Sequence, residues 1–143
     1  MNAEKTTTTM LENPKIDVKT KLAALWAATM FLYVYVDILG LFQPGALEQI
    51  LAGKVWLVDI TQTWALSAMI MMTIPGLMIF LSLALPATAN RWTNIVLGIV
   101  YIAISIGSVI GETWAYLIFG GVVEVVLLVL IVRYAWMWPK REA

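Results

Sequence analysis

The chemistry open to this chain lies in its carboxylic acids, because the residue types that most often carry catalysis are absent. The sequence contains neither Cys nor His, which removes thiol catalysis, the usual zinc and haem ligands and a Ser-His nucleophile pair. Four acids lie in or beside long apolar segments: Asp37, Asp59, Glu112 and Glu124. Such acids bind cations or carry protons. We expect no metal site and no cofactor.

Glu124 has the position that is hardest to explain as a surface charge. It follows Glu112 by twelve residues, about 18 Å of helix at 1.5 Å per residue, which predicts a place near the bilayer midplane. An isolated ionised carboxylate at that depth is costly. We therefore expect Glu124 to be protonated, bound to a cation, solvated in a cavity or hydrogen-bonded to another helix. Gly120 and Gly121 share its face and are expected to open space beside it.

The elements that position these acids are predicted to be transmembrane helices. The chain is 62% hydrophobic and 13% charged, whereas roughly a quarter of residues are charged in soluble domains. Each crossing needs about 20 apolar residues. The sequence predicts an all-α fold, a polytopic membrane protein with a four-helix transmembrane bundle in residues 22–139. The expected helices cover about 22–41, 56–85, 92–110 and 113–132.

The segments outside the helices are short and polar. Residues 1–21 hold a Thr run and alternating charges, which predicts a flexible tail. Residues 140–143 form the other predicted terminal segment. Residues 46–52 are an amphipathic stretch expected at the membrane interface. Pro75 is expected to kink the second helix, because it removes one backbone hydrogen bond.

The basic residues predict the orientation. One side of the predicted map holds eight of the nine Lys and Arg residues: Lys5, Lys15, Lys19, Lys21, Arg91, Arg133, Lys140 and Arg141. Lys54 alone lies on the other side. Basic residues accumulate on the cytoplasmic side, so both termini are predicted to be cytoplasmic, in a bacterial inner membrane. Asp37, Asp59 and Glu112 then lie near the outer surface.

Polar residues are spaced so that they share helix faces. Residues three or four apart lie on one face, and polar faces point into a bundle because lipid cannot satisfy them. Tyr33 lies one turn before Asp37 and is placed to hydrogen-bond it. The candidate binding residues are Glu124, Asp37, Glu112, Asp59, Tyr33, Gln62 and Tyr101. The alternative is that such groups only tie helices together or stabilise helix ends.

Three functional hypotheses follow from this arrangement. In the first, an outward-opening cavity leads from Asp37, Asp59 and Glu112 to Glu124, which exchanges a proton for a cation or small cationic solute. In the second, the protein is a structural or regulatory membrane subunit without transport activity. In the third, it is an intramembrane lipid-modifying enzyme with paired carboxylates; no known catalytic signature supports this one. The sequence has no basic patch for nucleic acid.

A partner is predicted in the membrane itself. Besides the lipid bilayer, we expect a second copy of the chain, because Ala103, Gly107 and Gly111 form a small-residue face opposite the polar face of the third helix. The alternative is that these small residues serve close packing within one chain.

The chain also resembles a family of small bacterial four-helix integral membrane proteins that carries no assigned activity. The resemblance rests on three groups of residues: Tyr33, Tyr35, Asp37 and Gly40 with Pro44 and Gly45; Gly111, Glu112, Ala115, Tyr116 and Glu124; and Trp136, Met137, Trp138 and Pro139. It implies the same four-helix topology and names no substrate.

Overall fold

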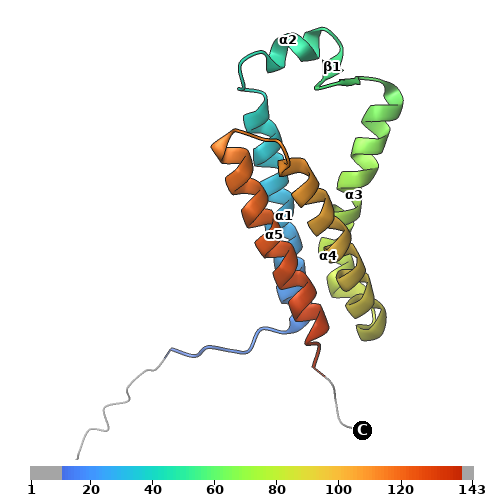
Figure 1. Ribbon diagram of the computed structural model, residues 1–143. Coiled ribbons are helices and arrows are strands. Elements are labelled where there is room, and N and C mark those ends of the chain that lie inside the picture. The colour runs from blue at the N-terminus through green and yellow to red at the C-terminus, as the bar shows by residue number, and fades with distance from the viewer. Residues whose placement is uncertain (1–10, 140–143) are drawn as a thin grey trace, which may run out of the picture.

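Four long helices dominate the structure, a computed structural model that describes residues 11–139 (Figure 1). They are α1 (Val18–Gly40), α3 (Gln62–Ala84), α4 (Ala87–Val109) and α5 (Ala115–Trp136). Each is long and apolar enough to cross a membrane. The prediction of an all-α bundle with four candidate membrane-spanning helices is confirmed. Part of the predicted tail, residues 1–10, and the segment 140–143 lie outside the described residues.

Side-chain caps set where two of the helices begin. α1 begins at Val18, earlier than the predicted residue 22, because the Asp17 carboxylate accepts a hydrogen bond from the Thr20 backbone N–H at 3.0 Å. The Thr20 hydroxyl donates a second bond to it, and these bonds hold the pKa of Asp17 below its usual value. α3 begins only at Gln62, where the Thr61 hydroxyl accepts from the Trp64 N–H at 3.1 Å.

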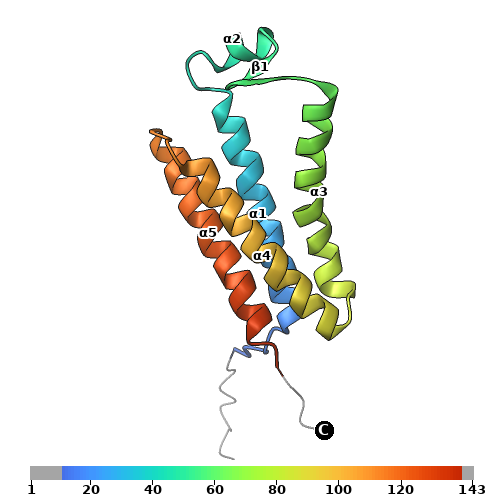
Figure 2. The ribbon, with the colours of Figure 1, turned by 45° about the vertical axis from the view of Figure 1, so that its right-hand side comes forward.

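The connection between α1 and α3 has structure of its own. It contains the short helix α2 (Ala46–Leu51) and an antiparallel pair of strands, β1 (Lys54–Val55) and β2 (Val58–Asp59). Trp56 has a φ of 57° in the turn between the strands, a conformation that a helix does not contain. The predicted helix 56–85 is therefore shorter at its start. In Figure 2, α2 and the strands lie at the top, beyond the ends of α1 and α3. The start of α1 and the end of α5 lie at the opposite end of the bundle.

Close helix approach at glycines joins α4 to α5. A Cβ atom at Gly98 would lie 2.6 Å from a Val132 methyl carbon, and one at Gly121 would lie 2.2 Å from a Val109 methyl carbon. Both distances are shorter than a van der Waals contact, so the two helices approach each other only because these positions lack side chains. α1 packs against α3 and α5, with Trp26 and Leu22 fully buried.

α3 is the least embedded of the four helices. It meets α4 from Met71 onward: the Met71 carbonyl accepts a hydrogen bond from Tyr101, and Ser82 exchanges hydrogen bonds with α4 side chains. Toward α2 the two helices diverge (Figure 2), and in the first half of α3 Leu66 and Met69 are 62% and 65% exposed. α3 therefore does not cover the half of α1 that is nearest α2.

The proline in α3 is compensated by a side chain from α4. Pro75 is buried within α3 and has no N–H to donate to the carbonyl of Met71 four residues earlier. The Tyr101 hydroxyl donates a hydrogen bond to that carbonyl. Tyr101 also packs its ring edge-to-face on Trp26, with 6.1 Å between ring centroids. The position of Pro75, where the sequence predicts a kink, is therefore a point of contact between α3 and α4.

Candidate functional site

Glu124 lies at the centre of the bundle. It follows the start of α5 by nine residues and precedes its end by twelve, about 13 Å and 18 Å of helix, and it is only 4% exposed. The prediction of a buried acid near the middle of a helix is confirmed. The described basic side chains lie toward the ends of the helices: Lys15, Lys19, Lys21, Lys54, Arg91 and Arg133.

Ser105 of α4 joins Glu124 to α1. The Glu124 carboxyl group interacts with the Ser105 hydroxyl, and the same hydroxyl lies 3.2 Å from the Tyr33 hydroxyl, as a buried hydrogen bond between α1 and α4. Tyr33 is also close enough to Glu124 and to Tyr101 for electrostatic interaction. The one-turn spacing of Tyr33 and Asp37 predicts a hydrogen bond between them. The structure places the Tyr33 hydroxyl against Ser105, so this expectation was wrong.

Asp37 lies beside this group but is open to its surroundings. Its carboxyl group is within electrostatic range of Glu124, yet the residue is exposed. The cause is the divergence of α3: Asp37 follows Met30 by two helical turns on α1, and Met30 touches α3 at Gly76. Where α3 has moved away, the same face of α1 is uncovered. The acidic pair therefore consists of one buried and one exposed carboxyl group.

Three of the candidates remain apart from this pair. Asp59 lies in β2 and is exposed, and Gln62 is the first residue of α3 and also exposed. Glu112 lies in the turn between α4 and α5, where its N–H donates to the carbonyl of Val109. The first turn of α5 is already about 13 Å from Glu124. The structure thus brings together Tyr33, Asp37, Tyr101 and Glu124, and leaves the other three at the α2 end.

The two glycines before Glu124 do not open space, contrary to the expectation from their spacing. A Cβ at Gly120 would lie 2.7 Å from a methyl carbon of Val36 on α1. The space beside Gly121 is occupied in the same way by Val109 of α4. Their role is to bring α1 and α4 onto α5, which places Tyr33 and Ser105 within reach of Glu124.

A second polar group nearer the other end of the bundle is internally satisfied. The Trp26 indole N–H donates to the Asn94 side-chain oxygen at 2.7 Å. The Asn94 amide donates to the Asn90 side-chain oxygen at 2.6 Å, and the Asn90 amide donates to the Ser82 carbonyl at 2.6 Å. All of these residues are buried. They tie α1, α3 and α4 together and leave no group free for a ligand.

The candidates predicted from the sequence include neither Ser105 nor any residue of the second polar group, which consists of Trp26, Asn94, Asn90 and Ser82. For Ser105 the available signal is its spacing of four residues from Tyr101, which places it on the same helix face. Trp26 precedes Thr29 and Tyr33 on the same face of α1, and that spacing was the available signal. Within residues 11–139, no cluster of three or more acids has the arrangement of a metal site.

The fold and this buried acid define a multi-pass membrane protein with an acidic group inside its helix bundle. The chain belongs to DUF6326, a family of unknown function whose model matches residues 12–143. Comparison with curated proteins and with solved structures finds no match.

Proposed function

We propose that this protein binds a cation or a small cationic solute at the pair formed by Asp37 and Glu124, and exchanges it across the membrane for a proton released from Glu124. The observation that carries the proposal is the unequal burial of two carboxyl groups that lie within electrostatic range of each other. The exposed acid can meet a cation first. The buried acid responds, because a neighbouring positive charge favours its ionised form.

The surroundings of Glu124 suit a group that gains and loses a proton. Its near partners are the hydroxyls of Ser105 and Tyr33, and a hydroxyl can donate to a carboxylate or accept from a carboxylic acid. A fixed positive charge would instead hold the carboxylate permanently ionised. The two protonation states can therefore alternate without rearrangement of the helices.

The apolar side chains beside Asp37 indicate which kind of cation the pair would favour. Val34 and Ile38 flank it on α1 and are 48% and 46% exposed. A cation that carries apolar groups gains contact with these side chains as well as with the carboxylate. A lipophilic cation is thus the favoured class.

Orientation completes the proposal. The described basic residues other than Lys54 lie toward the end of the bundle where α1 starts and α5 finishes, which supports cytoplasmic termini in a bacterial inner membrane. The exposed Asp37 then faces the outer half of the bilayer, and cations reach the pair from outside.

The test is proton movement in proteoliposomes that contain a pH-sensitive dye. The probes are sodium, potassium, ethidium and tetraphenylphosphonium. We expect at least one to drive proton movement with the wild-type protein. Glu124→Gln keeps a hydrogen-bonding side chain of nearly the same size and should abolish the response, whereas the matched control Glu48→Gln, in α2, should leave it intact. A silent Glu124→Gln in vesicles that move protons would refute the proposal for this residue.

The second candidate, a structural or regulatory subunit, is supported by one observation. The group formed by Trp26, Asn94, Asn90 and Ser82 is buried and satisfied, as expected of polar residues that only specify helix packing. If all four probes fail to move protons and Glu124→Gln leaves the folded yield unchanged, this second function is favoured.

A further inference from the structure

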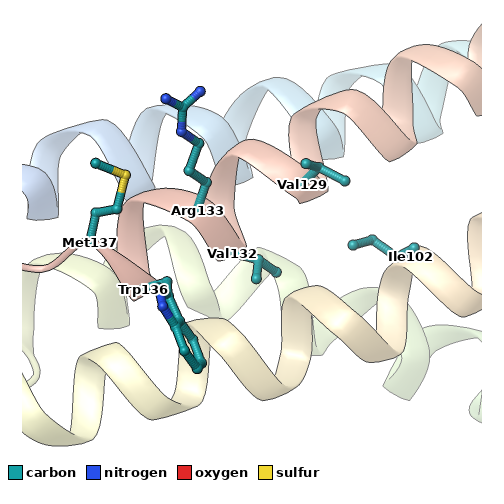
Figure 3. Close-up of a pocket in the computed structure, with 6 residues that line it drawn as sticks. All are labelled: Ile102, Val129, Val132, Arg133, Trp136 and Met137. Atoms are coloured by element: carbon teal, nitrogen blue, oxygen red, sulfur yellow. The ribbon is translucent and has the colours of Figure 1, made fainter.

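A groove on the surface of α4 and α5 includes neither residue of the acidic pair. It has a volume of about 340 Å³ and is lined by Ile102, Val129, Val132, Arg133, Trp136 and Met137 (Figure 3). This volume is within the range of small-molecule sites. The lining is apolar: Arg133 contributes its aliphatic stem, and its guanidinium points away from Ile102 and Trp136, at the rim of the groove (Figure 3).

The groove runs lengthwise along α5. Val129, Val132 and Trp136 follow one another at helical spacing, and Ile102 faces them from α4 (Figure 3). From Val129 to Trp136 the helix rises about 10 Å. Trp136 belongs to the last residues of α5, a position typical of the membrane interface. One end of the groove is thus at headgroup level and the other is among the acyl chains.

The rim of the groove nearest the end of α5 is cationic. Arg133 is exposed, and among the described residues it has no acidic partner. A second guanidinium, that of Arg91, lies 5.8 Å from the Trp136 ring and donates to the Trp136 carbonyl at 3.4 Å. The Nε atom of Arg91 is buried without a hydrogen-bond partner in the described part of the chain. One positive charge, that of Arg91, therefore lies beside the tryptophan, and a second, that of Arg133, lies at the rim on α5.

We propose that this groove binds an anionic phospholipid of the inner leaflet, with one acyl chain along Val129 and Val132 and the phosphate beside Arg133. Charge complementarity selects this occupant, because arginines near the membrane surface attract anionic headgroups and form paired hydrogen bonds with phosphate. An apolar partner helix would leave the guanidinium of Arg133 without a counter-charge.

The test is retention of lipid by the purified full chain, measured by native mass spectrometry in detergent. The probes are dioleoyl phosphatidylglycerol, which is anionic, and dioleoyl phosphatidylcholine, which is zwitterionic. We expect the wild type to prefer phosphatidylglycerol. Arg133→Gln should lower that preference about fivefold, which corresponds to ~1 kcal/mol for one arginine near the surface. Lys54→Gln, at the opposite end, is the matched control and should not change it.

A second pair of variants locates the acyl chain. Val129→Trp fills the groove and should reduce retention of both lipids, whereas Val122→Trp lies two turns away on the same face of α5, outside the lining, and should not. Helix content by circular dichroism confirms that each variant is folded. Equal retention of the two lipids by the wild type would overturn the proposal, as would an unchanged preference in Arg133→Gln or unchanged retention in Val129→Trp. The result does not depend on cation binding at Asp37 and Glu124.

Discussion

The hydrogen bond from Tyr101 to the Met71 carbonyl should be the polar contact on which α3 depends most. The bond exists because Pro75 cannot donate to that carbonyl. Hydrogen bonds in membrane proteins contribute on average about 0.6 and at most about 1.7 kcal/mol. Since the carbonyl has no helical donor and lies between helices, we expect Tyr101→Phe to cost ~1.5 kcal/mol of unfolding free energy, near the upper limit.

A double-mutant cycle separates this bond from general packing. Pro75→Ala restores an N–H that can donate to Met71, so Tyr101→Phe should then cost only ~0.5 kcal/mol, a coupling energy of ~1 kcal/mol. The assay is unfolding of the micelle-bound protein by titration with sodium dodecyl sulfate. The aromatic contact with Trp26 survives in the phenylalanine variant, so the cycle reports on the hydroxyl alone.

The control for this cycle removes a different tyrosine hydroxyl. Tyr33→Phe makes the same chemical change but breaks the 3.2 Å bond to Ser105, which does not involve α3. Its cost should add to that of Pro75→Ala within about 0.5 kcal/mol. An equal cost of Tyr101→Phe in the wild-type chain and in the Pro75→Ala variant would refute the assignment of the hydroxyl as the substitute donor.

Three further predictions concern orientation, association and close packing. A periplasmically active reporter should give signal when inserted at Lys54 and none when fused after Trp138; the reverse pattern contradicts the proposed topology. Gly107→Leu should lower the crosslinked dimer fraction in membranes without lowering monomer stability, because a Cβ there meets nothing within 4 Å; an unchanged dimer fraction rules out that face. Gly121→Ala should destabilise the fold by about 1–3 kcal/mol in the same titration, through overpacking against Val109; a neutral effect would show that α4 and α5 can separate at no cost.

The spacing of polar residues predicted the buried faces of α1, α4 and α5, but the prediction was wrong for α3, where Gln62 is exposed. Tyr33, Tyr101, Ser105 and Glu124 are buried as their shared faces required, since a lipid environment leaves polar side chains no other place. The long apolar runs predicted the four helices for the same reason. These are local properties of the chain, so they are readable without knowledge of which helices touch.

Properties that depend on contacts between helices were harder to predict. Asp37 is exposed because α3 diverges from its neighbours, and nothing in the α1 sequence encodes that divergence. The apolar residues before Asp59 predict that it lies on a helix, but the turn at Trp56 puts it in a strand. Gly120 shows that the role of a small residue also depends on its neighbours. A glycine can leave open space or allow another helix to pack closely, and here Val36 of α1 fills the space.

The association prediction gains one structural argument. Close packing within one chain was the alternative explanation for the small-residue face of α4. Gly107 has no atom near its missing Cβ, and Ala103 and Gly111 are exposed. Gly107 is therefore free of the close contacts that occupy Gly98 and Gly121, and a second copy of the chain remains the proposed partner.

The most direct test of the central proposal is the protonation state of Glu124 during cation binding. Infrared difference spectra of the purified protein, recorded as tetraphenylphosphonium is added, report the carbonyl band of a protonated carboxylic acid. We predict that this band decreases in the wild type, is absent from the Glu124→Gln difference spectrum, and requires more cation to decrease in Asp37→Asn. A cation that binds to the wild type without any loss of the band, or an identical loss in Glu124→Gln, would contradict proton release from Glu124.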